Sequence, residues 1–167
     1  HTYYSRLAAQ ISPCRETSDK YADFFAFYET LALVLADKAD LGIRIKAAYD
    51  SRDLSTLREI SDTVIPRIAE NLWNLRLLRE KLWMKDSKPF GYELLDIKLG
   101  GVSARLESCR RRLNAWLEQR VSCLEELEQE RLPYWTIENQ YPHRPDQSLR
   151  ENLWNKIVSG CDLIDTI

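Results

Sequence analysis

The histidines and carboxylates of this chain are the first residues to examine for chemistry, because acid–base and metal catalysis most often use them. The 167 residues include two histidines, the terminal His1 and His143, and no Glu-x-x-His pair of the kind that holds metals in helical bundles. His143 lies between two prolines, as in an exposed loop. The sequence also has no G-x-x-x-x-G-K-[ST] or G-x-G-x-x-G motif for binding phosphate. We therefore expect no catalytic residue, no metal and no cofactor.

The charged clusters of the chain have the pattern of helix surfaces. Arg110, Arg111 and Arg112 are consecutive, so on a helix they point around about 200° and form no single-faced basic patch. An acidic run, Glu125 to Glu130, is typical of a solvated face. Lys and Arg number 24 against 26 Asp and Glu, which gives a net charge of −2 and no field to attract nucleic acid. We expect neither a nucleic-acid partner nor a membrane span.

The segment over residues 88–105 has a feature that a solvent-exposed helix surface does not explain. Gly100 and Gly101 interrupt a strong helical pattern, at about 1 kcal/mol each relative to alanine. Either another helix or ring of the same chain crosses there, or the glycines belong to a docking surface for another domain or protomer. The docking candidates, of which Asp96, Gly100 and Gly101 are predicted to share one side of the helix, are Lys88, Phe90, Asp96, Gly100, Gly101 and Arg105.

The elements that must position these residues are predicted to be helices. The chain has 5 glycines and 6 prolines, few turn-forming residues for many short strands. Apolar residues recur at steps of three and four from Phe24 to about Ala48, with Gly42 as a weak point, and again from Leu57 to Leu82. Pro66 interrupts the second stripe, so that helix must kink there or restart after residues 61–62.

The third stripe is the most regular and carries the docking candidates. It predicts a helix over 91–118 with a seam that ends on a core tryptophan, through Leu95, Leu99, Val102, Leu106, Cys109, Leu113 and Trp116. The fold class is therefore all-α: a bundle of about three long antiparallel helices, a helical N-terminal extension, shorter flanking helices and an irregular tail rich in aromatic residues and proline. We expect one domain over 1–167, with a core bundle over about 17–133 and the tail over 134–167.

Part of the sequence resembles a known family. The segments that carry the resemblance are Lys88-Pro-Phe-Gly-Tyr-Glu93, Asp96-Ile-Lys-Leu-Gly-Gly101 with Arg105, and Arg112-Leu-Asn-Ala-Trp-Leu-Glu118 with Glu125-Glu-Leu-Glu128. They are similar to the C-terminal helical domain of bacterial family-20, subfamily C glycoside hydrolases, which are exo-β-N-acetylhexosaminidases. The resemblance is strongest over residues 86–133.

The resemblance implies a function without implying catalysis in this chain. In that family a barrel domain holds an adjacent Asp-Glu pair, in which the Glu is the general acid and the Asp steadies the acetamido nucleophile of the substrate. This chain has no Asp-Glu dipeptide, so no catalytic residue carries over. The resemblance implies a non-catalytic C-terminal module whose partners are the catalytic barrel domain of the parent chain and a second copy in a homodimer.

Two further expectations complete the sequence-based interpretation. The chain begins at His1 rather than Met, so we expect a fragment of a longer enzyme, and its widely spaced cysteines favour reduced thiols and the cytoplasm. The alternative function is a free-standing helical interaction or adaptor domain with no enzymatic role. A reading frame that continues upstream into a barrel would favour the hydrolase module.

Overall fold

The computed structural model describes residues 2–129, and every regular element in this range is helical. The elements are α1 (Thr2–Thr17), α2 (Ala22–Lys38), α3 (Leu41–Asp50), α4 (Leu54–Glu59), the π-helical turn η1 (Ile60–Val64), α5 (Ile65–Asp86), α6 (Tyr92–Leu117) and α7 (Glu125–Glu128). This confirms the all-α class and the helical N-terminal extension. The predicted tail over 134–167 lies outside the described residues. The residues up to Leu127 form one compact unit, and the prediction of a single domain over 1–167 stays a prediction.

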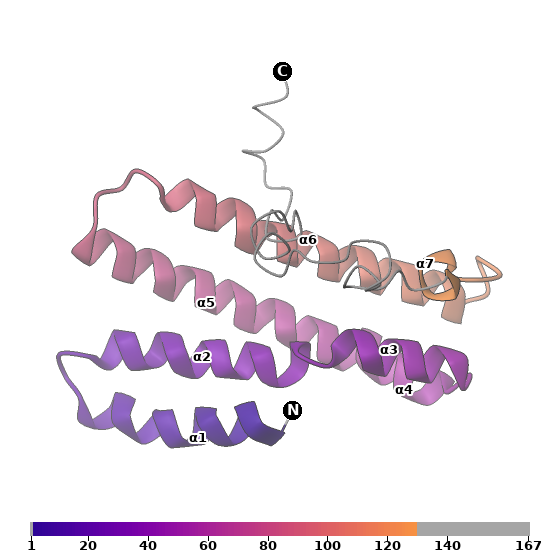
Figure 1. Cartoon of the computed structure of the whole chain (residues 1–167), viewed down its shortest axis with the longest axis horizontal. Coiled ribbons are helices and arrows are strands. Elements are labelled where there is room, and N and C mark those ends of the chain that lie inside the picture. The colour runs from indigo at the N-terminus through magenta and orange to yellow at the C-terminus, as the bar shows by residue number, and fades with distance from the viewer. Residues whose placement is uncertain (1, 130–167) are drawn as a thin grey trace, which may run out of the picture. The chain divides into compact units, whose positions relative to one another are not determined.

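The long helices alternate in direction, and polar contacts between them fix their register. On α2 and α5, Arg67 pairs with Asp37 and Lys81 pairs with Asp23, so residue numbers rise in opposite directions along the two helices. Figure 1 shows α1, α2, α5 and α6 side by side, with α6 antiparallel to α5. The predicted antiparallel arrangement of long helices is therefore present.

The first predicted stripe is divided between two helices. α2 ends at Lys38 and α3 begins at Leu41, so the break falls two residues before Gly42, the predicted weak point. Asp40, at φ −110° and ψ 4°, leaves the helical conformation at this break. The apolar spacing continues across it, which is why periodicity alone does not locate it.

The second predicted stripe passes Pro66 without restarting. The backbone widens into the π-turn η1, in which the Ile65 N–H donates to the Ile60 carbonyl five residues back. Ser61, fully buried, then lacks a backbone donor for its carbonyl, because Ile65 is already used and Pro66 has no N–H. The side chain of Arg110 on α6 supplies one, with Nε 3.1 Å from the Ser61 oxygen. The turn is thereby fastened to α6.

The third predicted helix is α6, within one residue of the predicted bounds at each end. Its seam faces the core as expected: Leu106, Leu113 and Trp116 are buried, and Leu99 and Val102 are partly buried against them.

Most of the buried side chains gather at the α3–α4 end of the compact unit. The Tyr49 and Trp116 rings lie 4.9 Å apart, centroid to centroid, and the Tyr49 hydroxyl accepts a hydrogen bond from the Leu124 N–H. Beside this core stand Leu41, Ile45, Leu57, Ile60, Val64 and Leu113. None of the helices in the described range is long and apolar enough to cross a membrane.

Candidate docking surface

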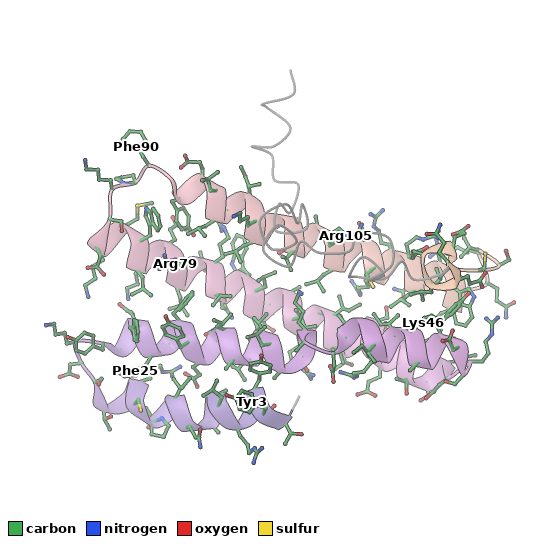
Figure 2. All side chains as sticks on the ribbon, in the orientation of Figure 1. Tyr3, Phe25, Lys46, Arg79, Phe90 and Arg105 are labelled. Carbon is green, nitrogen blue, oxygen red and sulfur yellow. The ribbon has the colours of Figure 1, made fainter. Side chains whose placement is uncertain are left out.

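The loop between α5 and α6 holds an exposed aromatic side chain in a fixed place. The indole Nε1 of Trp83 donates to the Lys88 carbonyl at 2.7 Å, and Gly91 adopts φ +94°, a conformation that favours glycine. The Gly91 N–H also donates to the Glu93 carboxylate at 2.8 Å. Between these anchors Phe90 is 86% exposed, more than any other large apolar side chain of the described residues. Figure 2 shows Phe90 at the tip of the loop, pointing away from the helices. The Phe90 ring is therefore exposed on a loop whose conformation is stabilised by hydrogen bonds on both sides of it.

Asp96 is engaged within the chain, where it joins α6 to α5. Its carboxylate accepts two hydrogen bonds from the Arg76 guanidinium, at 2.7 and 3.5 Å, and the Tyr92 hydroxyl donates to the Arg76 carbonyl. The hydrogen bond to Asp96 raises the pKa of Arg76. The pKa of Tyr92 is also raised, mainly because burial desolvates its hydroxyl and to a smaller extent because of the nearby Asp96 charge. Arg76 in turn lies over the Trp73 ring, 4.7 Å from its centroid.

The two adjacent glycines of α6 are open on the side where a side chain would stand. A Cβ atom built on Gly100 or on Gly101 meets no atom within 4 Å outside its own stretch of the helix backbone, and both residues are exposed. No described residue therefore crosses α6 closely at this point. Of the two explanations offered by the sequence, crossing by another part of the chain finds no support among residues 2–129.

A second stripe of apolar and small residues follows α6 on the side opposite its buried seam. Its members are spaced by three and four residues and form what we call the outer face of α6: Leu94, Ile97, Gly101, Ala104 and Ser108. Leu94 is 42% and Ile97 44% exposed, and Gly101 and Ala104 are exposed as well. This face is an apolar surface that the described part of the chain leaves uncovered.

Arg105 borders the outer face where a pocket begins. The pocket is lined by Arg105, Ser108, Arg111, Arg112, Asn114, Glu118, Arg120 and Glu126. Arg112 forms ion pairs with Glu125 and with Glu126, and its hydrogen bond lowers the pKa of Glu126 to about 2. Glu126 is therefore ionised at neutral pH and cannot act there as a general acid.

The structure brings some of the six predicted site residues together and separates others. Gly101 lies on the outer face, Arg105 borders this face one turn further along the helix, Gly100 lies at its edge, and Phe90 precedes it. Asp96 is nine residues from Arg105, which places the two on opposite sides of the helix. Lys88 is exposed in the loop, and its carbonyl serves as the anchor for Trp83.

Sequence reasoning missed Leu94, Ile97 and Ala104. Their three-and-four spacing was available, but glycine and serine within the stripe make it far less apolar than the buried seam. Across residues 2–129, no group of three or more His, Cys, Asp or Glu side chains is placed to hold a metal ion.

The comparisons with known proteins give one family. A family model described as the Glycoside Hydrolase 20C C-terminal domain matches residues 1–145. No curated protein matches the chain.

Proposed function

The chain belongs to the family of glycoside hydrolase 20C C-terminal domains, and from this premise we propose that it is the non-catalytic helical module of a bacterial exo-β-N-acetylhexosaminidase. The hydrolysis of terminal N-acetylhexosamine takes place in a separate barrel domain of the parent enzyme. The module contributes a docking surface for interdomain packing or dimerisation. We place the parent enzyme in the cytoplasm.

The acidic residues of the described pocket support the non-catalytic part of this proposal. Glycoside cleavage uses a carboxylic acid whose pKa is raised, together with a second carboxylate or an equivalent group of the substrate. Glu126 has the opposite property, since Arg112 holds its pKa at about 2. Glu118 forms an ion pair with Arg120 at 2.7 Å.

The observation that carries the docking role is the pair of open glycines beside exposed apolar side chains. Glycines in a helix interior cost about 1 kcal/mol each relative to alanine, and no other described element comes close to the Cβ positions of these two glycines. Phe90 and Ile97 add apolar surface that a partner would remove from water. Apolar surface of this kind contributes to stability only when another surface covers it and removes it from water.

The test compares Gly101→Leu in this chain and in the parent enzyme. A leucine has room on the outer face, so the 167-residue chain should stay folded, with an unchanged helical circular dichroism spectrum. In the parent enzyme the same leucine should hold the partner surface away and lower the melting temperature or the hydrolase activity. Gly100→Leu, at the edge of the face, should have a smaller effect.

Ser103→Leu is the matched control, because residue 103 is exposed on α6 but lies off the outer face. If Gly101→Leu unfolds the isolated chain, the glycine serves internal packing. If the parent enzyme responds to Gly101→Leu no more than to Ser103→Leu, the outer face has no docking role. Either result would overturn the proposal.

A further inference from the structure

The pocket beside the C-terminal half of α6 holds more positive than negative charge. Its lining includes two carboxylates and four arginines, which are Arg105, Arg111, Arg112 and Arg120. Two of the arginines are already paired, Arg112 with Glu126 at 2.9 Å and Arg120 with Glu118 at 2.7 Å. Arg105 and Arg111 form no ion pair with any residue of the described range 2–129. The pocket therefore keeps two positive charges that the described part of the chain does not neutralise.

The Arg111 guanidinium is drawn over the preceding turn of α6 by a hydrogen bond. Its Nη2 donates to the Ser108 Oγ at 3.3 Å, since residues three apart are neighbours on a helix surface. This bond uses one lone pair of the hydroxyl, so the hydroxyl hydrogen remains available to another acceptor. The other N–H groups of Arg111 have no acceptor within residues 2–129.

Arg105 approaches Ser108 from the opposite direction along the helix. It precedes Ser108 by three residues, as Ser108 precedes Arg111, so the serine stands between two guanidiniums. The hydrogen bond from Arg112 is the main reason that the pKa of Glu126 is lowered to about 2, and the charge of Arg105 adds to this effect. The Arg105 guanidinium thus lies on the side of α6 that faces the pocket.

Asn114 adds a further donor to the pocket. Its Oδ1 accepts a hydrogen bond from the Ser61 hydroxyl at 2.5 Å, and this contact fixes the orientation of the carboxamide. The Nδ2 group, on the other side of the carboxamide, has no acceptor among the described residues. Because Asn114 lines the pocket, its two N–H groups are available to a ligand there.

We propose that this pocket binds a phosphate group over Ser108, between the guanidiniums of Arg105 and Arg111. A phosphate monoester carries about −1.5 to −2 charges at pH 7, which matches the two unpaired arginines. Arginine binds phosphate through charge-assisted, often bidentate hydrogen bonds, and needs no glycine-rich loop to do so. The site goes beyond the proposed function and does not depend on it.

The arrangement of the donors favours phosphate over a carboxylate. Arg105, Ser108 and Arg111 lie on successive turns of α6, about 4.5 Å apart along its axis, and Asn114 follows one turn later. Donors spread along and around the helix in this way surround a tetrahedral group, whereas a planar carboxylate is met by donors in a single plane. Arg110 takes no part, because its side chain turns inward to the Ser61 carbonyl.

An NMR titration of the 167-residue chain with inorganic phosphate tests the site. Sodium chloride holds the ionic strength constant, so that screening does not change during the titration. The N–H signals of residues 105–114 should shift and saturate. Signals of α1 should stay in place, since Figure 1 shows α2 and α5 between α1 and α6. Shifts that never saturate, or that involve exposed arginines throughout the chain, would show diffuse attraction to positive charge and overturn the proposal.

Three substitutions distinguish a built site from an effect of net charge. Arg111→Gln should weaken phosphate binding by roughly tenfold, the loss expected for charge-assisted hydrogen bonds. Arg6→Gln is the matched control, because Arg6 is exposed on α1 and loses the same charge. Ser108→Ala removes a donor without changing the charge and should also weaken binding. If Arg111→Gln and Arg6→Gln act equally, or if Ser108→Ala has no effect, the pocket is not a phosphate site.

The same titration with other ligands identifies the source of the phosphate. Glucose 6-phosphate that binds more tightly than inorganic phosphate would support a site for a phosphorylated small molecule. Equal affinities would support a site for the phosphate group alone. Acetate should bind at least tenfold more weakly than phosphate, and glucose should not bind. Acetate or glucose that binds as tightly as the phosphate ligands would overturn the proposal.

Discussion

Gly100 and Gly101 make α6 less stable than alanine would at the same positions. Both have open space where a Cβ atom would stand, and neither has a positive φ. We expect Gly100→Ala and Gly101→Ala each to stabilise the isolated chain by about 1 kcal/mol, which raises the melting temperature by roughly 2–4 °C. Thermal denaturation followed by circular dichroism measures this. A loss of stability would mean that something packs against these glycines after all.

Arg110 is the residue on which the π-turn depends. Its Nε–H is the donor that the buried Ser61 carbonyl receives in place of a backbone N–H. We expect Arg110→Leu to destabilise the chain by about 1–3 kcal/mol, the cost of leaving a buried acceptor unsatisfied. Arg111→Leu, on the exposed side of the same helix, is the control in urea denaturation. Equal effects of the two substitutions would contradict this role for Arg110.

At the scale of the elements, the attachment of α7 to α6 is sensitive to pH. Arg112 lowers the pKa of Glu126 from its ordinary 4.5 to about 2. The folded state thus favours the ionised carboxylate, and the stabilisation is complete above pH 4.5 and is lost as the pH falls from about 4.5 towards 2. Because both side chains are largely exposed, the gain is below about 1 kcal/mol.

The comparison with Arg112→Gln isolates this contribution. Wild type should be the more stable protein at neutral pH, and the difference in free energy of unfolding should shrink through the acid range. A difference that stays constant down to pH 2 would show that Arg112 stabilises α7 by packing rather than by charge.

The helices differ in how far the sequence alone determines them. α6 was predicted almost to the residue because its buried seam is unbroken from Leu95 to Trp116. The break between α2 and α3 was misplaced, since it lies in backbone angles at Asp40 that apolar spacing does not record. The π-turn could not be predicted from Pro66 alone, because the widened backbone is stabilised by Arg110, a residue far away in the sequence.

Only some residues of the candidate surface could be predicted from the sequence. The glycine pair and Phe90 stood out by residue type. Whether a neighbouring helix covered them was a question of tertiary packing, and the open space at both glycines is a property of the folded chain. Asp96 shows the reverse case, because its partner Arg76 lies on α5 and no local pattern joins the two.

For the molecule as a whole, the family assignment leads to an expectation about activity. On the proposed function, the purified 167-residue chain should release no detectable N-acetylglucosamine from a chromogenic N-acetylglucosaminide, because the proposal assigns the groups that cleave the bond to a separate domain. The parent enzyme under the same conditions is the positive control. Measurable turnover by the purified chain would show that catalytic residues lie within it.

The position of the core along the chain also bears on how the protein is made. Leu57, Ile60 and Val64 are buried against residues of α6 and beyond, including Leu113, Trp116 and Leu124. A ribosome synthesises α1 to α5 before α6. When these helices emerge, the apolar side chains that later pack against the C-terminal half of α6 are still exposed to water. The nascent chain therefore cannot close its core until about residue 124 has left the exit tunnel. The helices at the N-terminal end of the compact unit therefore complete their folding only after its last helices have been synthesised.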